Sequence, residues 1–291
     1  MRGILDRSEK ARAATLLGPP FLYALLFLAI PLIAIVLFSF WTQDFMTLDR
    51  TFTLANYREI VEKPIYGVLL QRSLYVSACV TIVTVLLAYP IAYFVSFKVA
   101  PGRKSLWLFL ITIPFWTSYL IRVFLWKVIL GYNGVVNSSL IGIGLIDEPL
   151  SFILYNVNAV IITLAHAFAP FAILPIFVAL EKIDRSLLEA SQDLGENRFT
   201  TFLRVTLPLS TPGVVAAVLI VFIPTIGDYV TPELMGGAGG KLIANMIQTQ
   251  FLQLNNAPLG AALALVAMIS VTLISLVFIF LNRRWLRGRS G

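Results

Sequence analysis

The sequence predicts an all-α integral membrane protein with six transmembrane helices. Of its 291 residues, 58% are hydrophobic and only 13% are charged, whereas a soluble domain usually carries about 25% charged residues. Six stretches are long or nearly long enough to cross a bilayer, which takes about 20 apolar residues. Lys and Arg exceed Asp and Glu, at 22 against 15, and they flank the apolar stretches. We therefore expect a single membrane domain over residues 1–291.

The predicted spans run near residues 18–40, 73–97, 105–130, 153–180, 212–235 and 261–281. The first follows a basic N-terminus, as a signal peptide does. Its apolar core nevertheless exceeds the usual length of about 7–15 residues, and no small-residue cleavage site follows, so we expect it to remain as a span. The fifth contains Pro224, Gly227, Asp228 and Pro232. Broken helices are tolerated in membranes where they line a cavity, so this span is predicted to line one.

The basic residues predict the orientation of the spans, because loops rich in Lys and Arg stay on the cytoplasmic side. One side collects Arg2, Arg7, Lys10, Arg12, Lys98, Arg103, Lys104, Lys182, Arg185, Arg198, Arg204, Arg283, Arg284, Arg287 and Arg289. On the opposite side, residues 131–152 contain no basic residue and residues 236–260 contain only Lys241, whereas the loop at 41–72 is mixed. Both termini are therefore expected in the cytoplasm. The loop at 41–72 has the spacing of an amphipathic surface helix, with Ala55, Tyr57, Ile60 and Val61 on one face.

Several kinds of chemistry have little support in the sequence. The single cysteine, Cys79, cannot form an internal disulfide, and any His-based site would depend on His166 alone. The segment Gly236–Lys241 lacks the first Gly and the final Ser or Thr of a phosphate-binding loop, so it is expected to be a flexible Gly-rich turn. We expect no cofactor in this chain and no nucleic acid as a partner. Membrane lipid is the surrounding solvent.

The predicted cytoplasmic loop at 181–211 has the pattern of two short helices. Ser186 and Glu189 have capping-box spacing, Gly195 is suited to end the first helix, and Asn197 to cap the second. Pro208 is expected to end the second helix, whose face would be Phe199, Phe202 and Leu203, and Thr211-Pro212 to open the fifth span. The pattern alone favours an ordinary helix lying on the bilayer surface.

The same loop resembles the motif of permeases from binding-protein-dependent ABC importers, Glu-Ala-Ala, three residues, Gly, nine residues, Ile-x-Leu-Pro. Glu189, Ala190 and Gly195 match it, as do Leu207 and Pro208, while Ser191 replaces the third Ala and Val205 the Ile. The resemblance implies a type I importer permease whose loop is the coupling helix docking on an ATPase subunit. It also implies a bacterial cytoplasmic (inner) membrane location, and as partners a second homologous permease subunit, an ATPase dimer that binds ATP and Mg²⁺, and an extracytoplasmic solute-binding protein.

Other segments resemble the spermidine/putrescine subfamily of these permeases. They are Ile113–Arg122, Leu145-Ile146, Gly227–Gly237 and Gly260–Ala262. Where polyamine permeases often have Arg-Asp-Trp-Pro before the last span, this chain has Asn255-Asn256-Ala257-Pro258. The resemblance implies a small cationic solute, and a different small solute stays open.

Polar residues inside the spans are the candidates for the solute pathway, because polar groups are costly in lipid. Counted along ideal helices of about 1.5 Å per residue, Arg122, His166 and Asp228 fall in one layer of the outer half of the membrane. Asp228 and Glu233 would attract a cation, and the rings of Trp116, Tyr119 and Tyr229 would add cation–π contacts. A structural ion pair between Arg122 and Asp228, and interfacial roles for the aromatic residues, are the alternatives.

Two other classes of protein stay open. An ion-coupled secondary transporter would use the intramembrane charges Arg122 and Asp228, although the doubled repeat common in such transporters is not visible. A membrane-embedded enzyme would need a cluster of catalytic residues, and the sequence offers no convincing one.

Overall fold

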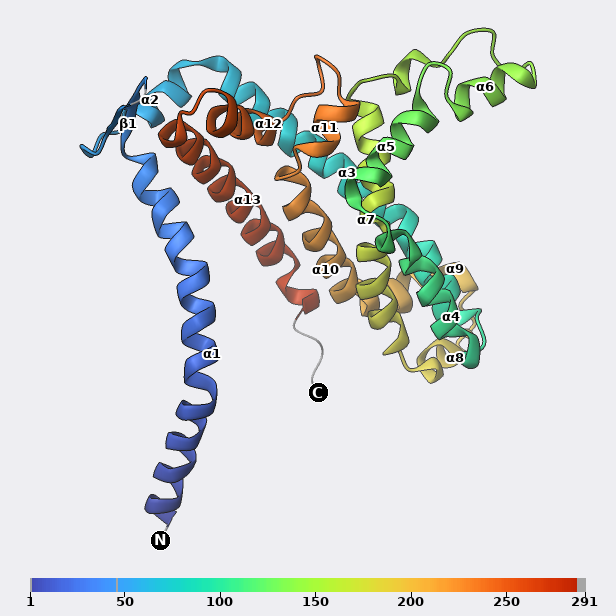
Figure 1. Ribbon diagram of the computed structural model, residues 1–291. Coiled ribbons are helices and arrows are strands. Elements are labelled where there is room, and N and C mark those ends of the chain that lie inside the picture. Colours follow the sequence, from blue (N-terminus) through green and yellow to red (C-terminus); the bar gives the residue numbers. More distant parts are fainter. Residues whose placement is uncertain (1, 46, 287–291) are drawn as a thin grey trace.

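A computed structural model describes residues 2–45 and 47–286 and shows a helical membrane protein (Figure 1). The helices, with η for 3-10 and π turns, and the two strands are α1 Arg2–Ser39, β1 Thr42–Asp44, β2 Thr47–Asp49, α2 Ala55–Glu62, α3 Pro64–Phe97, α4 Pro101–Thr112, η1 Ile113–Trp116, α5 Tyr119–Leu130, α6 Val135–Gly142, η2 Ser151–Ile153, α7 Val157–Glu181, α8 Arg185–Asp193, α9 Arg198–Thr201, η3 Phe202–Thr206, α10 Leu207–Ile226, α11 Val230–Met235, α12 Ile243–Gln248, η4 Thr249–Gln253 and α13 Ala257–Leu286. The all-α prediction is confirmed except for the antiparallel hairpin of β1 and β2, which the sequence did not reveal.

The described residues contain six segments long and apolar enough to cross a membrane, as predicted. The second span begins at Pro64 rather than residue 73, because Pro64 occupies the first helical turn, where its missing N–H costs nothing. The N-terminal end of α1 and the C-terminal end of α13 both point toward the lower side of the molecule, where α8 lies (Figure 1). The predicted basic residues Arg287 and Arg289 lie outside the described residues.

The prediction of one continuous third span at 105–130 is wrong. The chain forms α4, then the 3-10 turn η1, and starts a new helix, α5, at Tyr119. Pro114 lacks an N–H for the helix ladder, and Thr117 and Ser118 are extended, with ψ of 145° and 139°. By length and hydropathy the third span is Tyr119–Gly142, although α6 lies beyond the bundle at its upper end (Figure 1).

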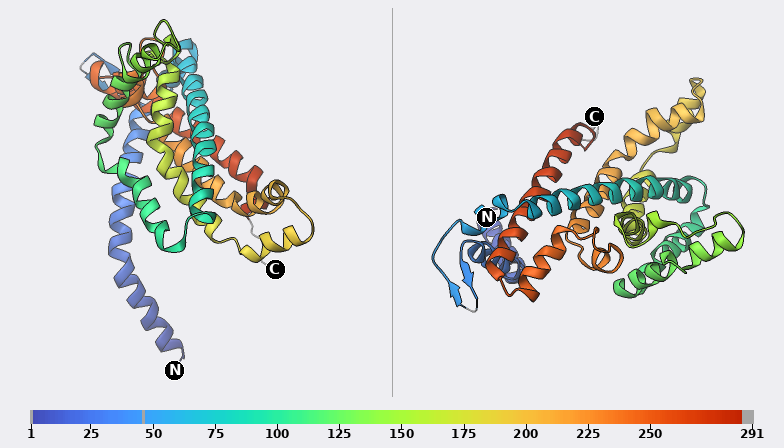
Figure 2. Two further views of the ribbon diagram at one scale, coloured as in Figure 1. Left: turned by 90° about the vertical axis from the view of Figure 1, so that its right-hand side faces the viewer. Right: turned by 90° about the horizontal axis from the view of Figure 1, so that it is seen from above.

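The core is the packing of α3, α7 and α10, the three helices that contact one another most extensively. Small residues at the contacts, including Ala88, Ala92, Ala172 and Ala217, are fully buried and let the helices approach closely. A Cβ on Gly213 of α10 would lie 2.5 Å from the Ala179 Cβ of α7, so glycine is required there. In contrast, residues 15–39 of α1 are mostly exposed, with only Ser39 at the helix end buried, and α1 stands apart over its N-terminal half (Figure 2).

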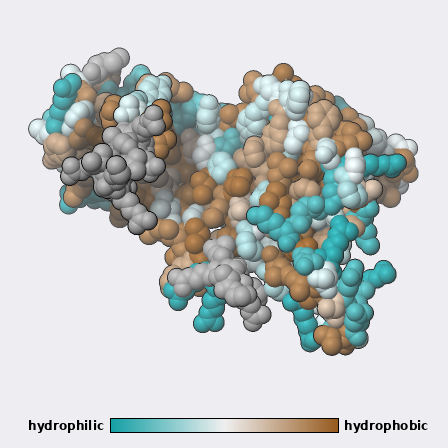
Figure 3. Space-filling model, turned by 90° about the horizontal axis from the view of Figure 1, so that it is seen from below, coloured by the Kyte–Doolittle hydropathy of each residue, from teal (hydrophilic) through white to brown (hydrophobic). Residues whose placement is uncertain are grey.

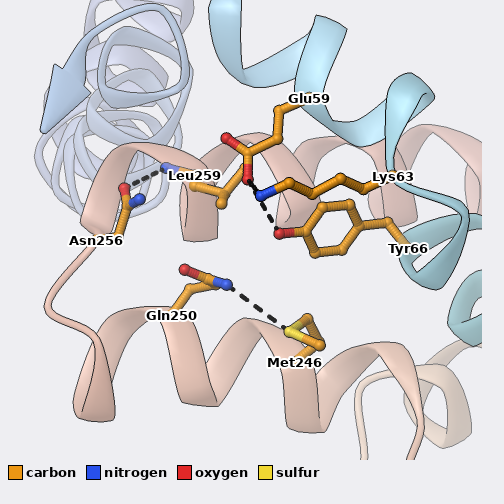
Figure 4. Close-up of polar contacts among 7 residues, drawn as sticks. All are labelled: Glu59, Lys63, Tyr66, Met246, Gln250, Asn256 and Leu259. Atoms are coloured by element: carbon orange, nitrogen blue, oxygen red, sulfur yellow. Dashed lines mark hydrogen bonds and ion pairs between the residues drawn. The ribbon is translucent and has the colours of Figure 1, made fainter.

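The upper end carries α2, the helix expected in the loop at 41–72. Its buried face is Asn56, with Tyr57 and Ile60 half-buried, whereas Ala55 and Val61 are exposed, so the predicted face is only partly right. A carboxylate oxygen of Glu59 accepts from Lys63 Nζ at 2.8 Å and from Tyr66 Oη at 3.3 Å. These bonds fasten α2 to the start of α3, close to α12 and α13 (Figure 4).

Candidate functional site

The broken fifth span places Asp228 at the upper end of the bundle. Helix α10 ends at Ile226, and α11 begins at Val230, so the break predicted from Pro224 and Gly227 is confirmed. Asp228 Oδ1 accepts from the Val230 N–H at 3.0 Å and, weakly, from the Thr231 N–H at 3.5 Å. The carboxylate thus caps the first turn of α11 and is fixed in direction.

The second oxygen of Asp228 joins the broken span to α5. Tyr119 Oη donates to Asp228 Oδ2 at 2.6 Å and lies 2.6 Å from the hydroxyl of Thr231, which is fully buried. The sequence predicted Tyr119 as an aromatic contact for a cation, and the structure shows its hydroxyl bound to the carboxylate itself. Because a carboxylate offers about four acceptor positions, Asp228 retains capacity for a further donor.

The second predicted carboxylate, Glu233, lies on α11, the short helix that follows Asp228. Glu233 is exposed, and its Oε2 accepts from Asn245 Nδ2 at 3.2 Å. Asn245 of α12, only 2% exposed, also donates to the carbonyl of Tyr229 at 2.9 Å. Asn245 and Thr231 were not predicted from the sequence, since Asn245 belongs to no recognised motif and Thr231, although it lies in the segment Gly227–Gly237, is neither charged nor aromatic. Together they bind α11 to its neighbours through neutral donors.

Arg122 is placed one helical turn above Tyr119 and is 8% exposed. Within the described residues it forms no ion pair with Asp228, so the predicted alternative of an Arg122–Asp228 pair is not what the structure contains. Its Nη2 donates to the Thr117 carbonyl at 3.2 Å and its guanidinium lies 5.4 Å from the Phe115 ring centre, while its Nε has no partner. The break after Pro114 exposes that carbonyl and so supplies the arginine with an acceptor.

The side chains of the remaining predicted pathway residues have surroundings of their own. Trp116 is 77% exposed and packs edge-on against Phe109, with ring centres 5.9 Å apart. Tyr229 is 44% exposed and lines an apolar cavity of about 690 Å³ between α10, α12 and α13. His166 accepts a hydrogen bond from Trp126 Nε1 at 3.1 Å. The described residues contain no group of three or more His, Cys, Asp or Glu that could hold a metal ion.

The Gly-rich segment that follows α11 is a tight loop and not the flexible turn expected. Gly237 has φ of +59°, and a Cβ there would collide with the Tyr155 carbonyl. Arg72 of α3 donates to the carbonyls of Gly239 at 2.7 Å and Lys241 at 3.3 Å. Close backbone packing accounts for Gly236, Gly237 and Gly240, where a Cβ would lie less than 3 Å from another atom.

At the lower end, the two predicted helices of the 181–211 loop are confirmed as α8 and α9. Gly195 follows α8 with φ of +88°, the left-handed conformation expected of a C-terminal stop. Asn197 caps α9 by accepting from the Thr200 N–H at 2.9 Å. The capping-box prediction for Ser186 is wrong, because Asp184 is the cap and accepts from the Ser186 N–H at 3.0 Å. That hydrogen bond lowers the pKa of Asp184.

The predicted end of the second helix at Pro208 is also wrong. From α9 the chain passes through the π-helical turn η3 directly into α10, so Thr211 and Pro212 lie inside a helix. The wider turn bonds the Leu207 N–H to the Phe202 carbonyl, and prolines are tolerated in membrane helices where such local adjustments satisfy the backbone. Leu207 and Pro208 therefore start α10, and the backbone is helical without interruption from α9 into the fifth span.

The lower surface presents apolar side chains beside polar ones. Leu187, Leu194 and Phe199 are 48%, 86% and 70% exposed, and Glu189, Ala190 and Gly195 are exposed next to them. Phe202, in contrast, turns inward and packs edge-on against Tyr89 and Tyr93 of α3, with ring centres 5.7 and 6.0 Å apart. Hydrophilic and hydrophobic side chains lie side by side on this face (Figure 3). Exposed apolar residues gathered beside polar ones are typical of a protein-docking surface.

The side chain of Ser191 on α8 contacts α9. Its hydroxyl lies 3.0 Å from the hydroxyl of Thr201, which is 4% exposed. The serine that replaces the usual alanine of the motif thus contributes a contact between α8 and α9. We conclude that the motif residues form one compact unit on the lower face.

A broken intramembrane helix that carries carboxylates, together with a helical docking surface at the opposite end, defines the chain as a transport permease that spans the membrane. The match to the family of binding-protein-dependent transport system inner membrane components covers residues 20–288, and the chain belongs to this family. It is therefore an inner-membrane permease subunit of an ABC importer, a transport component rather than an enzyme, in a class of systems whose ATPase is a separate subunit.

The curated relatives cover almost the whole chain. The spermidine/putrescine transport system permease protein PotB of Haemophilus influenzae is 38% identical over 97% of both chains. PotB of Escherichia coli is 37% identical over 88% of this chain and 92% of its own length. The E. coli inner membrane ABC transporter permease protein YdcU is 33% identical over 92% of this chain and 88% of its own length.

The solved structures bear on the fold alone, because their identities are low. A chain of a bacterial ABC transporter involved in the import of the acidic polysaccharide alginate has a TM-score of 0.74 at 19% identity, and the match covers 98% of this chain and 99% of that one. A chain of the MetNI methionine ABC transporter, in inward-facing conformations, has a TM-score of 0.56 over 77% of this chain and 98% of its own. The importer permease fold is thus confirmed.

Proposed function

We propose that the chain forms half of the pathway of an ATP-driven importer for spermidine, putrescine or a related polyamine. The observation that carries the proposal is the relation to PotB at 37–38% identity over most of the chain. The charge of the site also suits a cationic solute, since the two predicted pathway residues on the broken span, Asp228 and Glu233, are both acidic.

A polyamine carries ammonium groups separated by methylenes, and it suits two acidic groups offset along a path. Asp228 and Glu233 stand at opposite ends of the first turn of α11, and each is bound by a neutral donor, Tyr119 or Asn245. No lysine or arginine in the described residues forms an ion pair with either carboxylate. An ammonium group can therefore pair with them without displacing a resident cation, and the exposed rings of Trp116 and Tyr229 are the candidates for cation–π contacts.

Coupling to ATP hydrolysis is assigned to the lower surface. Helix α8, with Glu189, Ala190 and Ser191, docks in a groove of an ATPase subunit, and Gly195 allows the turn between α8 and α9. Leu207 and Pro208 carry the motion into α10. The ATPase subunits form a dimer and hold ATP and Mg²⁺, and this chain holds no cofactor. Both termini lie on the same, cytoplasmic side.

The complete importer contains a second homologous permease subunit and a solute-binding protein on the opposite side of the membrane. The proposal for the second permease is supported by α1, which is mostly exposed in a single chain. The apolar surface that such a helix leaves exposed contacts lipid or another subunit.

The test starts from the intact complex, isolated from its host through a tag on this chain. The solute released from the copurified binding protein is identified by mass spectrometry, and a polyamine is expected. Uptake of labelled spermidine and putrescine is then measured for Asp228→Asn and Glu233→Gln, with Glu62→Gln as the control because the Glu62 side chain is 68% exposed on α2. We expect weaker or slower uptake in the first two variants alone. A neutral or anionic solute would refute the cation pathway, and normal uptake in both variants would remove these carboxylates from it.

A further inference from the structure

A cluster of charged and polar side chains joins the lower ends of three helices to α8. Glu181, the last residue of α7, accepts from Lys104 of α4 through both carboxylate oxygens, at 2.6 and 2.8 Å. The same carboxylate accepts from the hydroxyl of Ser96, next to the last residue of α3, at 2.6 Å. One side chain thereby holds the ends of α3, α4 and α7 together.

The cluster is shielded from water at its centre. Ser96 is 1% exposed, and the side chains of Lys104 and Glu181 are 12% and 33% exposed. Lysine side chains are rarely buried unless they are paired, and a partly buried pair is screened less by salt than one on the surface. The ion pairs Arg58–Glu62 and Lys63–Glu59 at the other end of the molecule are more exposed.

Both charges stand at the end of their helix where the backbone dipole disfavours them. Glu181 is at the C-terminus of α7, where negative charge is unfavourable, and Lys104 is in the first turn of α4, where positive charge is unfavourable. If helix stability alone decided, the C-terminus of α7 would carry a positive charge and the first turn of α4 a negative one. The pair therefore stabilises the connection between the helices and not the helices themselves.

Helix α8 is fastened to the same cluster within four residues of Glu181. Ile183 is 8% exposed in the core, and Asp184 caps α8. Arg185, the first residue of α8, donates to the Ser96 carbonyl at 3.3 Å and lies 5.9 Å from the Phe97 ring centre. A displacement at the start of α8 must therefore move the ends of α3, α4 and α7 or break these contacts.

We propose that Glu181, held by Lys104 and Ser96, is a positioning residue for energy coupling, which transmits movement of α8 to the spans. The α9 end of the docking surface is continuous with α10, whereas its α8 end reaches the bundle through this cluster. The inference rests on the proposed function, since it requires α8 to be the segment that docks on the ATPase subunit.

The test uses the complete importer in proteoliposomes and compares two variants, Glu181→Gln and Lys104→Met, with a matched control, Lys98→Met. Lys98 is an exposed lysine that directly follows α3. The readouts are the yield of assembled complex, ATPase activity stimulated by the loaded binding protein, and solute uptake. The decisive quantity is the number of ATP molecules hydrolysed per solute molecule imported, because a purely structural role would lower both rates together.

We expect both variants to assemble and to hydrolyse ATP, with the ATP per solute raised by about tenfold, the factor set by losing one charge-assisted hydrogen bond. The reversed pair, Lys104→Glu with Glu181→Lys, should lower the ratio again, and Lys104→Arg should keep it near the wild-type value. A ratio unchanged in Glu181→Gln overturns the proposal. If Glu181→Gln does not assemble, Ser96→Ala takes its place, because it removes one hydrogen-bond donor and no charge. Ser96→Ala should raise the ATP hydrolysed per solute about twofold, and an unchanged value would also overturn the proposal.

A separate measurement distinguishes this inference from the proposed function. Cys79 is replaced by Ser, and a cysteine is introduced at the exposed Gln192 of α8 for cross-linking to the ATPase subunit. Failure of α8 to cross-link contradicts the docking on which both proposals depend. Efficient cross-linking with an unchanged ATP per solute in Glu181→Gln contradicts only the role of Glu181.

Discussion

Substitution of Gly195 tests the coupling surface most sharply, because the structure isolates one physical effect there. Gly195 has φ of +88°, and a Cβ built on it meets no atom within 4 Å. The cost of a side chain is therefore backbone strain without steric collision, about 1–2 kcal/mol for a residue with a Cβ in the left-handed region. That energy changes the ratio of the native turn to other turn conformations by about 5–30-fold.

The expected order of coupling is Gly195, then Gly195→Asn, then Gly195→Ala, and last Gly195→Val, because asparagine tolerates this conformation and a β-branched residue does not. The assay measures solute uptake and stimulated ATPase activity in proteoliposomes, at equal amounts of assembled complex. Uptake should fall several-fold in the Ala and Val variants while ATP is still hydrolysed. Wild-type uptake in Gly195→Val, or an Asn variant as poor as the Val variant, would refute the reasoning.

Three further predictions follow from single contacts. Reversing both charges, Arg122→Asp with Asp228→Arg, should not restore the assembly lost in either single variant, because the two residues form no ion pair; restored yield would mean that they do pair. Gly213→Ala places a Cβ 2.5 Å from that of Ala179 and should destabilise the α7–α10 contact by about 1–3 kcal/mol, seen as a lower melting temperature in detergent. Tyr119→Phe removes the 2.6 Å donor to Asp228 and should cost about 1.5–3 kcal/mol; an unchanged melting temperature would contradict this.

The sequence predicted the spans, the broken fifth helix and the two helices of the 181–211 loop, because hydrophobic runs, prolines and a positive-φ glycine act locally. It did not predict the partners of the site residues. Tyr119 and Asp228 are separated by 109 positions and Glu181 and Lys104 by 77, and their contacts depend on how the helices pack. The third span was predicted as continuous because one proline hardly changes the hydropathy of a segment. The backbone, however, departs from the α-helix at Pro114, which has no N–H to donate. Likewise, Phe202 of the π turn before Leu207 packs against Tyr89 of α3, a contact between residues far apart in the sequence.

The central claim is that this chain conducts a polyamine under the control of a separate ATPase. Its most direct test is uptake of labelled spermidine and putrescine into proteoliposomes that contain the complex isolated with this chain, with its binding protein outside and ATP inside. We predict uptake that requires both ATP and the binding protein and that falls in Asp228→Asn. Uptake that proceeds without ATP, driven by an ion gradient through the chain alone, or ATP-dependent uptake that excludes both polyamines, would contradict the claim.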